Sequence, residues 1–187
     1  IPRTRGMSRS RPLQDVVDEV TRVAGQGFKE VAITGVHLGG WGKDLSSGGR
    51  LIQLLRHLDD HPSDVRFRVS SLEPMDCTLE VRDLLVGSGR FLPHFHLPLQ
   101  HASDRVLRAM RRPYSRAYYD ALVNALAERL PHASIGSDVL IGFPGETDED
   151  HDTNVRWLSQ SPLTHLHVFP YSDRPGTLAS GLPDKVP

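Results

Sequence analysis

The chain contains a single cysteine, Cys77, among its 187 residues. One thiol excludes a disulfide within the chain, and it excludes a zinc or iron–sulfur site built from several of the chain's own cysteines. We therefore expect a reducing, cytoplasmic compartment. The apolar runs are all shorter than the roughly 18–20 residues that span a bilayer, so we expect no membrane partner.

Net charge and aromatic side chains are also scarce. The formal net charge is -1, and aromatic residues make up 6% of the chain. Overall charge therefore does not attract nucleic acid, so any such binding depends on local patches. The few aromatic side chains disfavour a stacking platform for single strands. The hydrophobic share of 38% is enough to build a core, which excludes intrinsic disorder.

Short apolar segments alternate with amphipathic ones along the chain. Strands are predicted over residues 30–34, 66–71, 94–99, 134–143 and 163–169. Amphipathic helices are predicted between them, with Ser10 as N-cap of the first helix and Thr147 as N-cap of the last. This alternation predicts βαβ units with parallel strands, in an open doubly wound sheet or in a closed or partial barrel.

A polar or glycine-rich group follows each predicted strand. These groups are Thr34–His37, Ser70–Pro74, Pro98–Ser103, Gly142–Glu146 and Tyr171–Thr177. Parallel strands bring their carboxyl ends to one edge, so the recurrence of such groups predicts an enzyme core. Asp138 differs, because it lies inside an apolar strand. It is either paired or functional, since burying a lone carboxylate is costly, or it faces water at the start of the strand.

Histidines and arginines suggest two further kinds of site. His94 and His96 share one strand face, and together with His101, His165 and His167 they would suit a metal-dependent barrel hydrolase. Ordinary hydrogen-bonding histidines are the alternative that we favour, and we assign no metal ligand. Arginines cluster near the start of the chain and again over residues 105–116. They are either phosphate contacts of an RNA-binding module without catalysis or a solvated helix face.

Six ordered motifs carry a more specific signal. They are IPRTRGMSRSRP, ITGVHLGGWG, RVSSLEP, HLPLQHASDRVLRAMRRPYS, DVLIGFPGETDEDH and VFPYSDRPGTLAS. Together they resemble the central radical S-adenosylmethionine (SAM) domain of the methylthiotransferases over essentially the whole chain. The resemblance implies an α/β fold, a partial TIM-like (β/α) barrel of parallel strands with outer helices that lacks its first strand and cluster loop. Residues 1–187 would be a fragment of the radical SAM core, with the N-terminal methylthiotransferase domain, the cluster-binding cysteines and a C-terminal TRAM domain outside this chain.

The resemblance also implies cofactors and partners. In that family a Cys-x3-Cys-x2-Cys motif lies just upstream of the position of Ile1 and ligates a [4Fe–4S] cluster at which SAM is cleaved. SAM and [4Fe–4S] clusters are thus the implied cofactors. The implied partners are the anticodon loop of tRNA and an electron donor such as flavodoxin or ferredoxin. We expect the 187 residues alone to be inactive.

Matching the motifs residue by residue implies a set of binding residues but no catalytic residue. The implied SAM contacts are Thr34, Gly35, Glu73, Gln100, Ser103, Asp138 and Gly142. The implied substrate contacts are Arg3, Arg5, Tyr171, Ser172 and Arg174.

The motifs are most similar to those of enzymes that add a methylthio group to C2 of N6-threonylcarbamoyladenosine at position 37 of tRNA. The alternatives are the relatives that modify isopentenyladenosine-37 and those that modify an aspartate of ribosomal protein S12. The segment Gln100–Ser103 reads Gln-His-Ala-Ser where Gln-Ser-Gly-Ser is more usual, and this variant resembles the ribosomal-protein enzymes.

Overall fold

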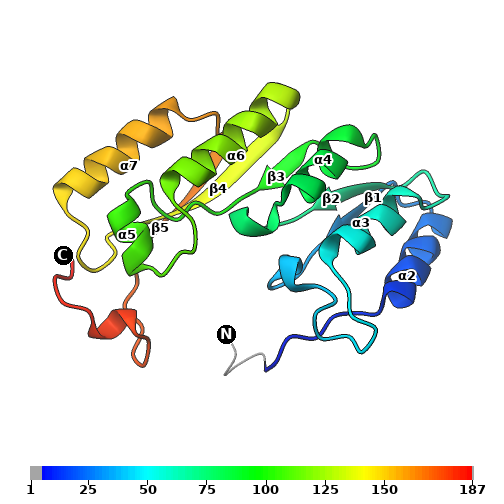
Figure 1. The fold of residues 1–187 in the computed structure, drawn as a ribbon, viewed down its shortest axis with the longest axis horizontal. Coiled ribbons are helices and arrows are strands. Elements are labelled where there is room, and N and C mark those ends of the chain that lie inside the picture. Colours follow the sequence, from blue (N-terminus) through cyan, green and yellow to red (C-terminus); the bar gives the residue numbers. More distant parts are fainter. Residues whose placement is uncertain (1–5, 187) are drawn as a thin grey trace. The chain divides into compact units, whose positions relative to one another are not determined.

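The computed structural model describes residues 6–186, and the chain divides into two compact units, Ile1–Pro93 and His94–Pro187. Figure 1 follows the elements of both units along the chain. Within the described residues, no helix is long and apolar enough to cross a membrane. Arg3 and Arg5, two of the implied substrate contacts, lie outside the described residues.

The first unit is built on a pair of parallel strands. Its elements are α2 (Leu13–Gly25), β1 (Glu30–Ile33), η1 (Leu38–Gly40), α3 (Leu51–Asp59), β2 (Arg66–Val69), η2 (Pro74–Asp76) and α4 (Leu79–Gly87). Strands β1 and β2 pair with Glu30 opposite Arg66 and Ile33 opposite Val69. Leu55 and Leu58 of α3 are fully buried, because their spacing places them on one apolar helix face.

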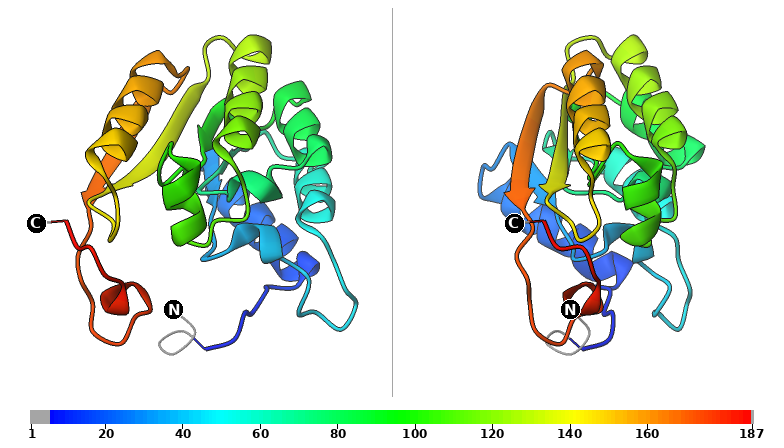
Figure 2. Two further views of the ribbon diagram at one scale, coloured as in Figure 1. Left: turned by 60° about the vertical axis from the view of Figure 1, so that its left-hand side comes forward. Right: turned by 90° about the vertical axis from the view of Figure 1, so that its left-hand side faces the viewer.

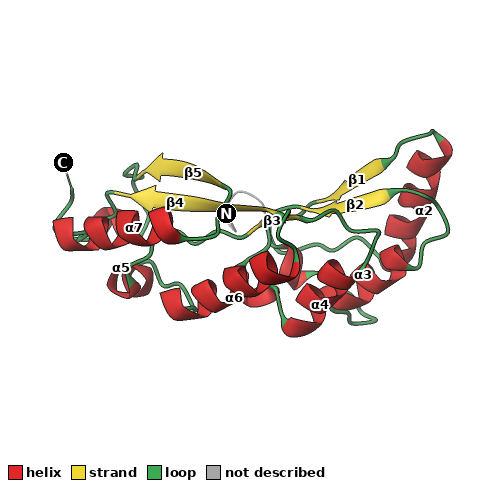
Figure 3. Cartoon of the chain, turned by 90° about the horizontal axis from the view of Figure 1, so that it is seen from above, coloured by secondary structure: helices red, strands yellow, loops and turns green. Residues whose placement is uncertain are grey.

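The second unit contains a three-stranded parallel sheet in the order β3-β4-β5. Its elements are β3 (His94–His96), α5 (Asp104–Ala109), α6 (Arg116–Arg129), β4 (Ser134–Ile141), α7 (Asp148–Gln160), β5 (His165–Pro170) and η3 (Ala179–Gly181). Helices α5, α6 and α7 lie on one face of this sheet, as Figures 2 and 3 show. Along β4, Ile135, Ser137 and Val139 are buried, whereas Asp138 between them is half-buried.

The two predicted helix caps have different outcomes. Thr147 does cap α7, since its Oγ1 accepts from the backbone N–H of Asp150 at 3.3 Å and the Asp150 carboxylate accepts from the Thr147 N–H at 3.0 Å. Ser10 as N-cap was wrong, because α2 begins after Pro12. Ser10 lies two residues too early to reach the first turn, and its hydroxyl donates to Asp44 Oδ1 at 2.5 Å instead.

The predicted α/β architecture of parallel strands with outer helices is confirmed. Each predicted strand is present with somewhat different ends, and the third differs most, because it is shortened to His94–His96. The strands of the described residues form one two-stranded and one three-stranded sheet, and no closed barrel is present among them. Every paired strand is parallel, so the carboxyl ends of neighbouring strands share one edge in each unit.

Candidate functional site

The first unit places Thr34 and Gly35 directly after β1 and Glu73 after β2. The loops that follow the two strands are joined by a hydrogen bond between His37 Nε2 and Asp76 Oδ2 at 2.9 Å. Gly39 permits this approach, because a Cβ at its position would lie 2.0 Å from the carboxyl carbon of Asp76. At the carboxyl ends of β1 and β2, the two following loops are therefore held together by this hydrogen bond.

A cavity of about 950 Å³ opens in the first unit. Its walls are the segment Gly6–Arg11, one face of α2, strand β1 and the loop after β1. Thr34 and Gly35 line it, but Glu73 is not among its lining residues. A mostly apolar hollow of this size with polar groups at its rim suits a small organic ligand such as SAM.

In the second unit, Gln100 occupies a left-handed backbone conformation, with φ of 71°. Its N–H donates to the Asp138 carbonyl at 2.9 Å, and its carbonyl accepts from the Leu140 N–H at 2.8 Å. The segment after β3 therefore stays paired with β4 until Gln100 turns it away. A non-glycine residue in this conformation costs roughly 1–2 kcal/mol, and such residues cluster at functional sites.

Helix α7 holds the segment that follows Gln100. The Ser103 hydroxyl donates to Asp150 Oδ1 at 2.6 Å, and Arg105 forms an ion pair with the same carboxylate. Burial by itself raises the pKa of Asp150, but hydrogen bonds from Arg105, Ser103 and Thr147 outweigh it, so the pKa lies below the usual aspartate range. The Ser103 hydroxyl is thus engaged within the protein, and its implied contact with SAM stays a prediction.

Gly142 begins the turn after β4 in a left-handed conformation, with φ of 73°. Its N–H donates to Glu146 Oε2 at 2.6 Å, and the N–H of Phe143 donates to the same oxygen at 3.1 Å. The other oxygen of Glu146 lies 3.4 Å from His101 Nε2. Burial lowers the pKa of His101. Glu146 ends the polar group Gly142–Glu146 that was predicted after this strand, but no role of its own was predicted for it.

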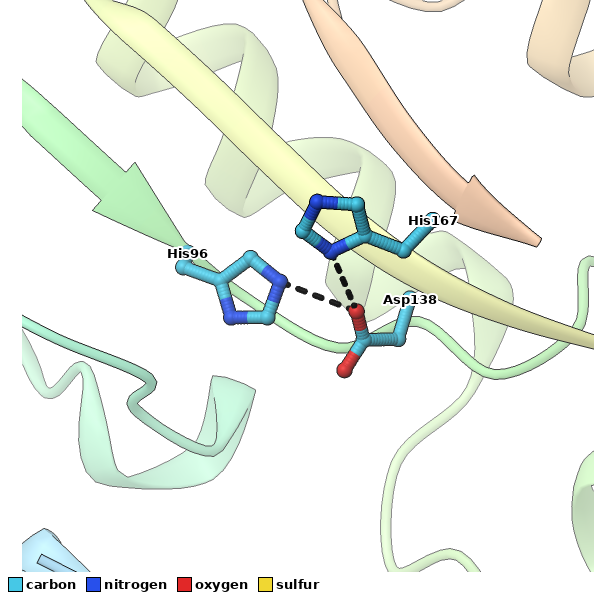
Figure 4. A group of neighbouring side chains, drawn as sticks. All are labelled: His96, Asp138 and His167. Carbon is cyan, nitrogen blue, oxygen red and sulfur yellow. Dashed lines mark hydrogen bonds and ion pairs between the residues drawn. The ribbon is translucent and has the colours of Figure 1, made fainter. Parts of the chain in front are cut away.

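Asp138 is paired with two histidines (Figure 4). His96 Nε2 lies 3.0 Å and His167 Nδ1 lies 3.1 Å from the same oxygen, Asp138 Oδ1. The Asp138 side chain is 25% exposed. Of the two alternatives for this acid, the paired one is confirmed. Its implied contact with SAM stays a prediction, because Asp138 lies within β4 rather than at the carboxyl end.

The loop after β5 carries the other implied substrate contacts. The Tyr171 N–H donates to the Ile141 carbonyl at 2.7 Å, and its ring lies 5.7 Å from the ring of Phe143, centroid to centroid. Ser172 and Arg174 are exposed. A polar, exposed loop anchored by one aromatic ring suits contact with a large polar partner.

Cys77 does not fit an iron–sulfur ligand. Its side chain is buried, and burial raises the pKa of the thiol to about 12. Cluster ligation needs an accessible thiolate. Because Cys77 is the one cysteine of the sequence, these 187 residues do not supply the ligands of a [4Fe–4S] cluster.

The chain matches a known protein family, and this match defines its class. The model of the radical SAM superfamily matches residues 1–158, and the chain belongs to that superfamily. The predicted membership of the radical SAM superfamily is thereby confirmed.

Two kinds of curated relative match the whole chain. The threonylcarbamoyladenosine tRNA methylthiotransferase MtaB of Aquifex aeolicus is 41% identical over 187 residues, which are 100% of this chain and 45% of that protein. The MtaB of Bacillus subtilis is 38% identical, with 100% and 41% covered. The tRNA-2-methylthio-N(6)-dimethylallyladenosine synthase of Pelotomaculum thermopropionicum is 37% identical, with 100% and 42% covered. The chain thus spans less than half the length of these relatives.

Solved structures share the fold at low sequence identity. The radical SAM methyltransferase TsrM of Kitasatospora setae superposes with a TM-score of 0.65 at 23% identity, over 84% of this chain and 30% of that chain. Coproporphyrinogen III oxidase (HemN) of Escherichia coli, a radical SAM enzyme, gives 0.63 at 22% identity, over 90% and 38%. The radical SAM type of α/β fold is therefore confirmed.

Proposed function

We propose that the protein carrying this chain is a radical SAM transferase that adds a methylthio group to C2 of N6-threonylcarbamoyladenosine at position 37 of tRNA. The observation that carries the proposal is similarity along the whole chain to two enzymes of that name, at 41% and 38% identity. Relatives that act on dimethylallyladenosine reach 37%, so the isopentenyl-type substrate is the second candidate.

The chain supplies the core of such an enzyme rather than all of it. We place the cluster-binding cysteines, the N-terminal methylthiotransferase domain and the C-terminal TRAM domain in other parts of the protein. The lack of any cluster ligand set among these residues supports that division. Bound beside a [4Fe–4S] cluster, SAM would supply the radical chemistry that such a reaction needs. The residues described here bind SAM, orient the substrate and exclude water from the reaction.

In the first unit, Thr34 and Gly35 would hold SAM at the rim of the cavity that they line. Because Gly35 carries no side chain, its backbone is accessible to a ligand at this rim. Glu73, at the end of β2, offers a carboxylate to the amino group or to the ribose hydroxyls of SAM.

In the second unit, Gln100 and Gly142 are the strongest candidates for SAM contacts. Both lie at the carboxyl ends of neighbouring strands in left-handed conformations. The Asp150 carboxylate positions the intervening loop through Ser103. On the substrate side, Tyr171, Ser172 and Arg174, together with Arg3 and Arg5, would contact the anticodon loop, where arginine suits phosphate and base edges. A flavodoxin or ferredoxin would supply the electron.

The experiment is mass spectrometry of tRNA nucleosides from a strain that lacks the complete gene. We expect the 2-methylthio-threonylcarbamoyl nucleoside to disappear and its unmethylthiolated precursor to accumulate. Loss of the isopentenyl counterpart instead would keep the enzyme class and overturn the substrate. If neither nucleoside changes, the tRNA proposal fails, and modification of ribosomal protein S12 is examined in the same strain.

A biochemical test separates SAM binding from tRNA binding. In the complete, cluster-loaded protein, Gln100→Ala should slow SAM cleavage at least about tenfold, a loss of about 1.4 kcal/mol of transition-state stabilisation. Its affinity for tRNA should stay unchanged. The matched control is Gln160→Ala at the far end of α7, which should alter neither. A Gln100→Ala variant that loses tRNA affinity but cleaves SAM normally would remove Gln100 from the cofactor pocket.

A further inference from the structure

The open face of the β3-β4-β5 sheet, opposite its helices, carries a group of polar side chains that the proposed function does not use as a unit. His94 and His96 come from β3, Asp138 from β4, and His165 and His167 from β5. Three of them, His96, Asp138 and His167, converge on one point (Figure 4).

Strand pairing explains this convergence. His167 is the register partner of Asp138, so their side chains stand side by side on one face. His96 is the partner of Gly136, two residues before Asp138 on the same face, so it reaches Asp138 diagonally. The three ligating groups thus come from three adjacent strands of a rigid sheet, not from a flexible loop.

The spacing of the three donor atoms suits a metal ion. With bonds of about 2.05 Å, two ligand atoms of a tetrahedral zinc ion lie about 3.3 Å apart. The separations of Asp138 Oδ1 from His96 Nε2 and from His167 Nδ1 are 3.0 and 3.1 Å. One ligand atom from each of the three residues lies within 4.8 Å of the others, so the donor atoms are close enough to converge on one ion when it binds.

Neighbouring rings restrain the two imidazoles. The ring of His167 lies 5.8 Å from that of His165 and 6.5 Å from that of Phe169, and the His96 and His167 rings are 5.5 Å apart. The His167 side chain is 57% exposed and the His96 side chain 16%, so the group is held in place and still accessible. Such preorganisation lowers the cost of binding an ion.

We propose that His96 Nε2, Asp138 Oδ1 and His167 Nδ1 form a binding site for a divalent metal ion of the Zn²⁺ and Fe²⁺ class. Two imidazoles and one carboxylate are the donor set that these ions prefer, whereas Mg²⁺ and Ca²⁺ prefer oxygen ligands alone. Three protein ligands leave coordination positions open for water or for an oxygen or nitrogen atom of a bound substrate. From the sequence, His96 and His167 were expected to be ordinary hydrogen-bonding histidines, and Asp138 was an implied SAM contact.

The test measures retention of Zn²⁺ by the complete protein. Its [4Fe–4S] clusters are assembled first, so that the cluster cysteines are occupied and do not capture the probe. The protein is then equilibrated with Zn²⁺, passed through a desalting column and analysed by atomic emission. We expect about one equivalent of Zn²⁺ beyond the cluster content. Co²⁺ in place of Zn²⁺ should give the visible spectrum of nitrogen and oxygen ligands, without a thiolate charge-transfer band.

The matched control is His94→Ala, which removes an imidazole from the same strand and the same face outside the three ligands. It should retain Zn²⁺ like the parent, whereas His96→Ala and His167→Ala should each bind at least about tenfold more weakly. Asp138→Asn keeps the shape of the side chain and should also lose the ion. Circular dichroism verifies that each variant is folded.

Two results would overturn the metal site. One is a parent protein that retains no Zn²⁺ or Co²⁺ after desalting. The other is retention by the three ligand variants equal to that of His94→Ala. In either case the group is a carboxylate that only accepts hydrogen bonds from two imidazoles. Neither result bears on methylthiotransferase activity, because Zn²⁺ retention is measured without SAM or tRNA.

Discussion

Replacing Asp150 by alanine removes the residue that ties helix α7 to the loop after β3. Its carboxylate accepts from the Ser103 hydroxyl at 2.6 Å and from the Thr147 hydroxyl at 2.7 Å, and it pairs with Arg105. It also closes the capping box of α7 through the Thr147 N–H. The Asp150 side chain is only 9% exposed, so water does not replace these partners fully in the variant.

The expected loss can be built from these contacts. Loss of the two hydroxyl hydrogen bonds costs about 1 kcal/mol each. Loss of the reciprocal cap adds about 1 kcal/mol. The Arg105 side chain is 52% exposed, so its ion pair contributes roughly 0–1 kcal/mol. Asp150→Ala should therefore lower the free energy of unfolding by about 3–4 kcal/mol, which for a chain of this size corresponds to a fall in Tm of about 6–16 °C.

Thermal and urea unfolding followed by circular dichroism measure this loss. The matched control is Glu149→Ala, which removes an exposed carboxylate from the same first turn of α7. Only the helix-dipole contribution of Glu149 is lost, so its cost should be about 0.5 kcal/mol. If Asp150→Ala is no more destabilising than Glu149→Ala, the buried carboxylate does not hold the loop and the reasoning fails.

Further predictions follow from particular residues. Gln100→Gly should raise the Tm, because it relieves roughly 1–2 kcal/mol of left-handed strain, while SAM cleavage falls; a lower Tm would contradict the strain. Gly42→Ala should destabilise the protein by about 2 kcal/mol or more in urea unfolding, since its φ is 86° and its Cβ would lie 2.7 Å from the backbone of Gly49. Gly48→Ala, with φ of 66° and open space, is the control and should cost less. At about pH 8, Cys77 should resist iodoacetamide in the native protein, since its buried thiol has a pKa of about 12, and react after unfolding; rapid native labelling, detected by peptide mapping, would show that the site opens. The stability that Asp150 contributes should be complete above its unfolded pKa of about 3.9 and decline as the pH falls below it, because its folded pKa is lower. The difference in unfolding free energy between parent and Asp150→Asn should shrink in that range, and a constant difference would contradict the pKa shift.

Much of the fold follows from local pattern. The run Leu51–Leu58 repeats its apolar residues at helical spacing, so it could be identified as a helix that buries one face. The short apolar segments around Ile33, Val69 and Ile135 could be identified as buried strands for the same kind of reason. Thr147 and Asp150 form a capping box by their spacing alone.

Other features depend on which segments meet. Ser10 was predicted to be a helix cap because serine often fills that position. In the structure its hydroxyl instead donates a hydrogen bond to the Asp44 carboxylate, 34 residues away. Ser103 was implied to contact SAM, and nothing near it in sequence indicates that its hydroxyl donates a hydrogen bond to Asp150. The hydrogen bonds that Glu146 accepts from the Gly142 and Phe143 amides were not predicted, because they depend on the path of the turn.

The sequence by itself determined the superfamily, the order of strands and helices, and the polar groups that follow each strand. Those properties are local, because periodicity, capping and motif spacing act within a few residues. Tertiary structure decided which of the chemically active side chains share a site. His96, Asp138 and His167 are 42 and 29 residues apart in sequence, and only the parallel register of β3, β4 and β5 brings their donor atoms together. Strand pairing between distant segments sets that register, and the order of the residues within each strand does not reveal it.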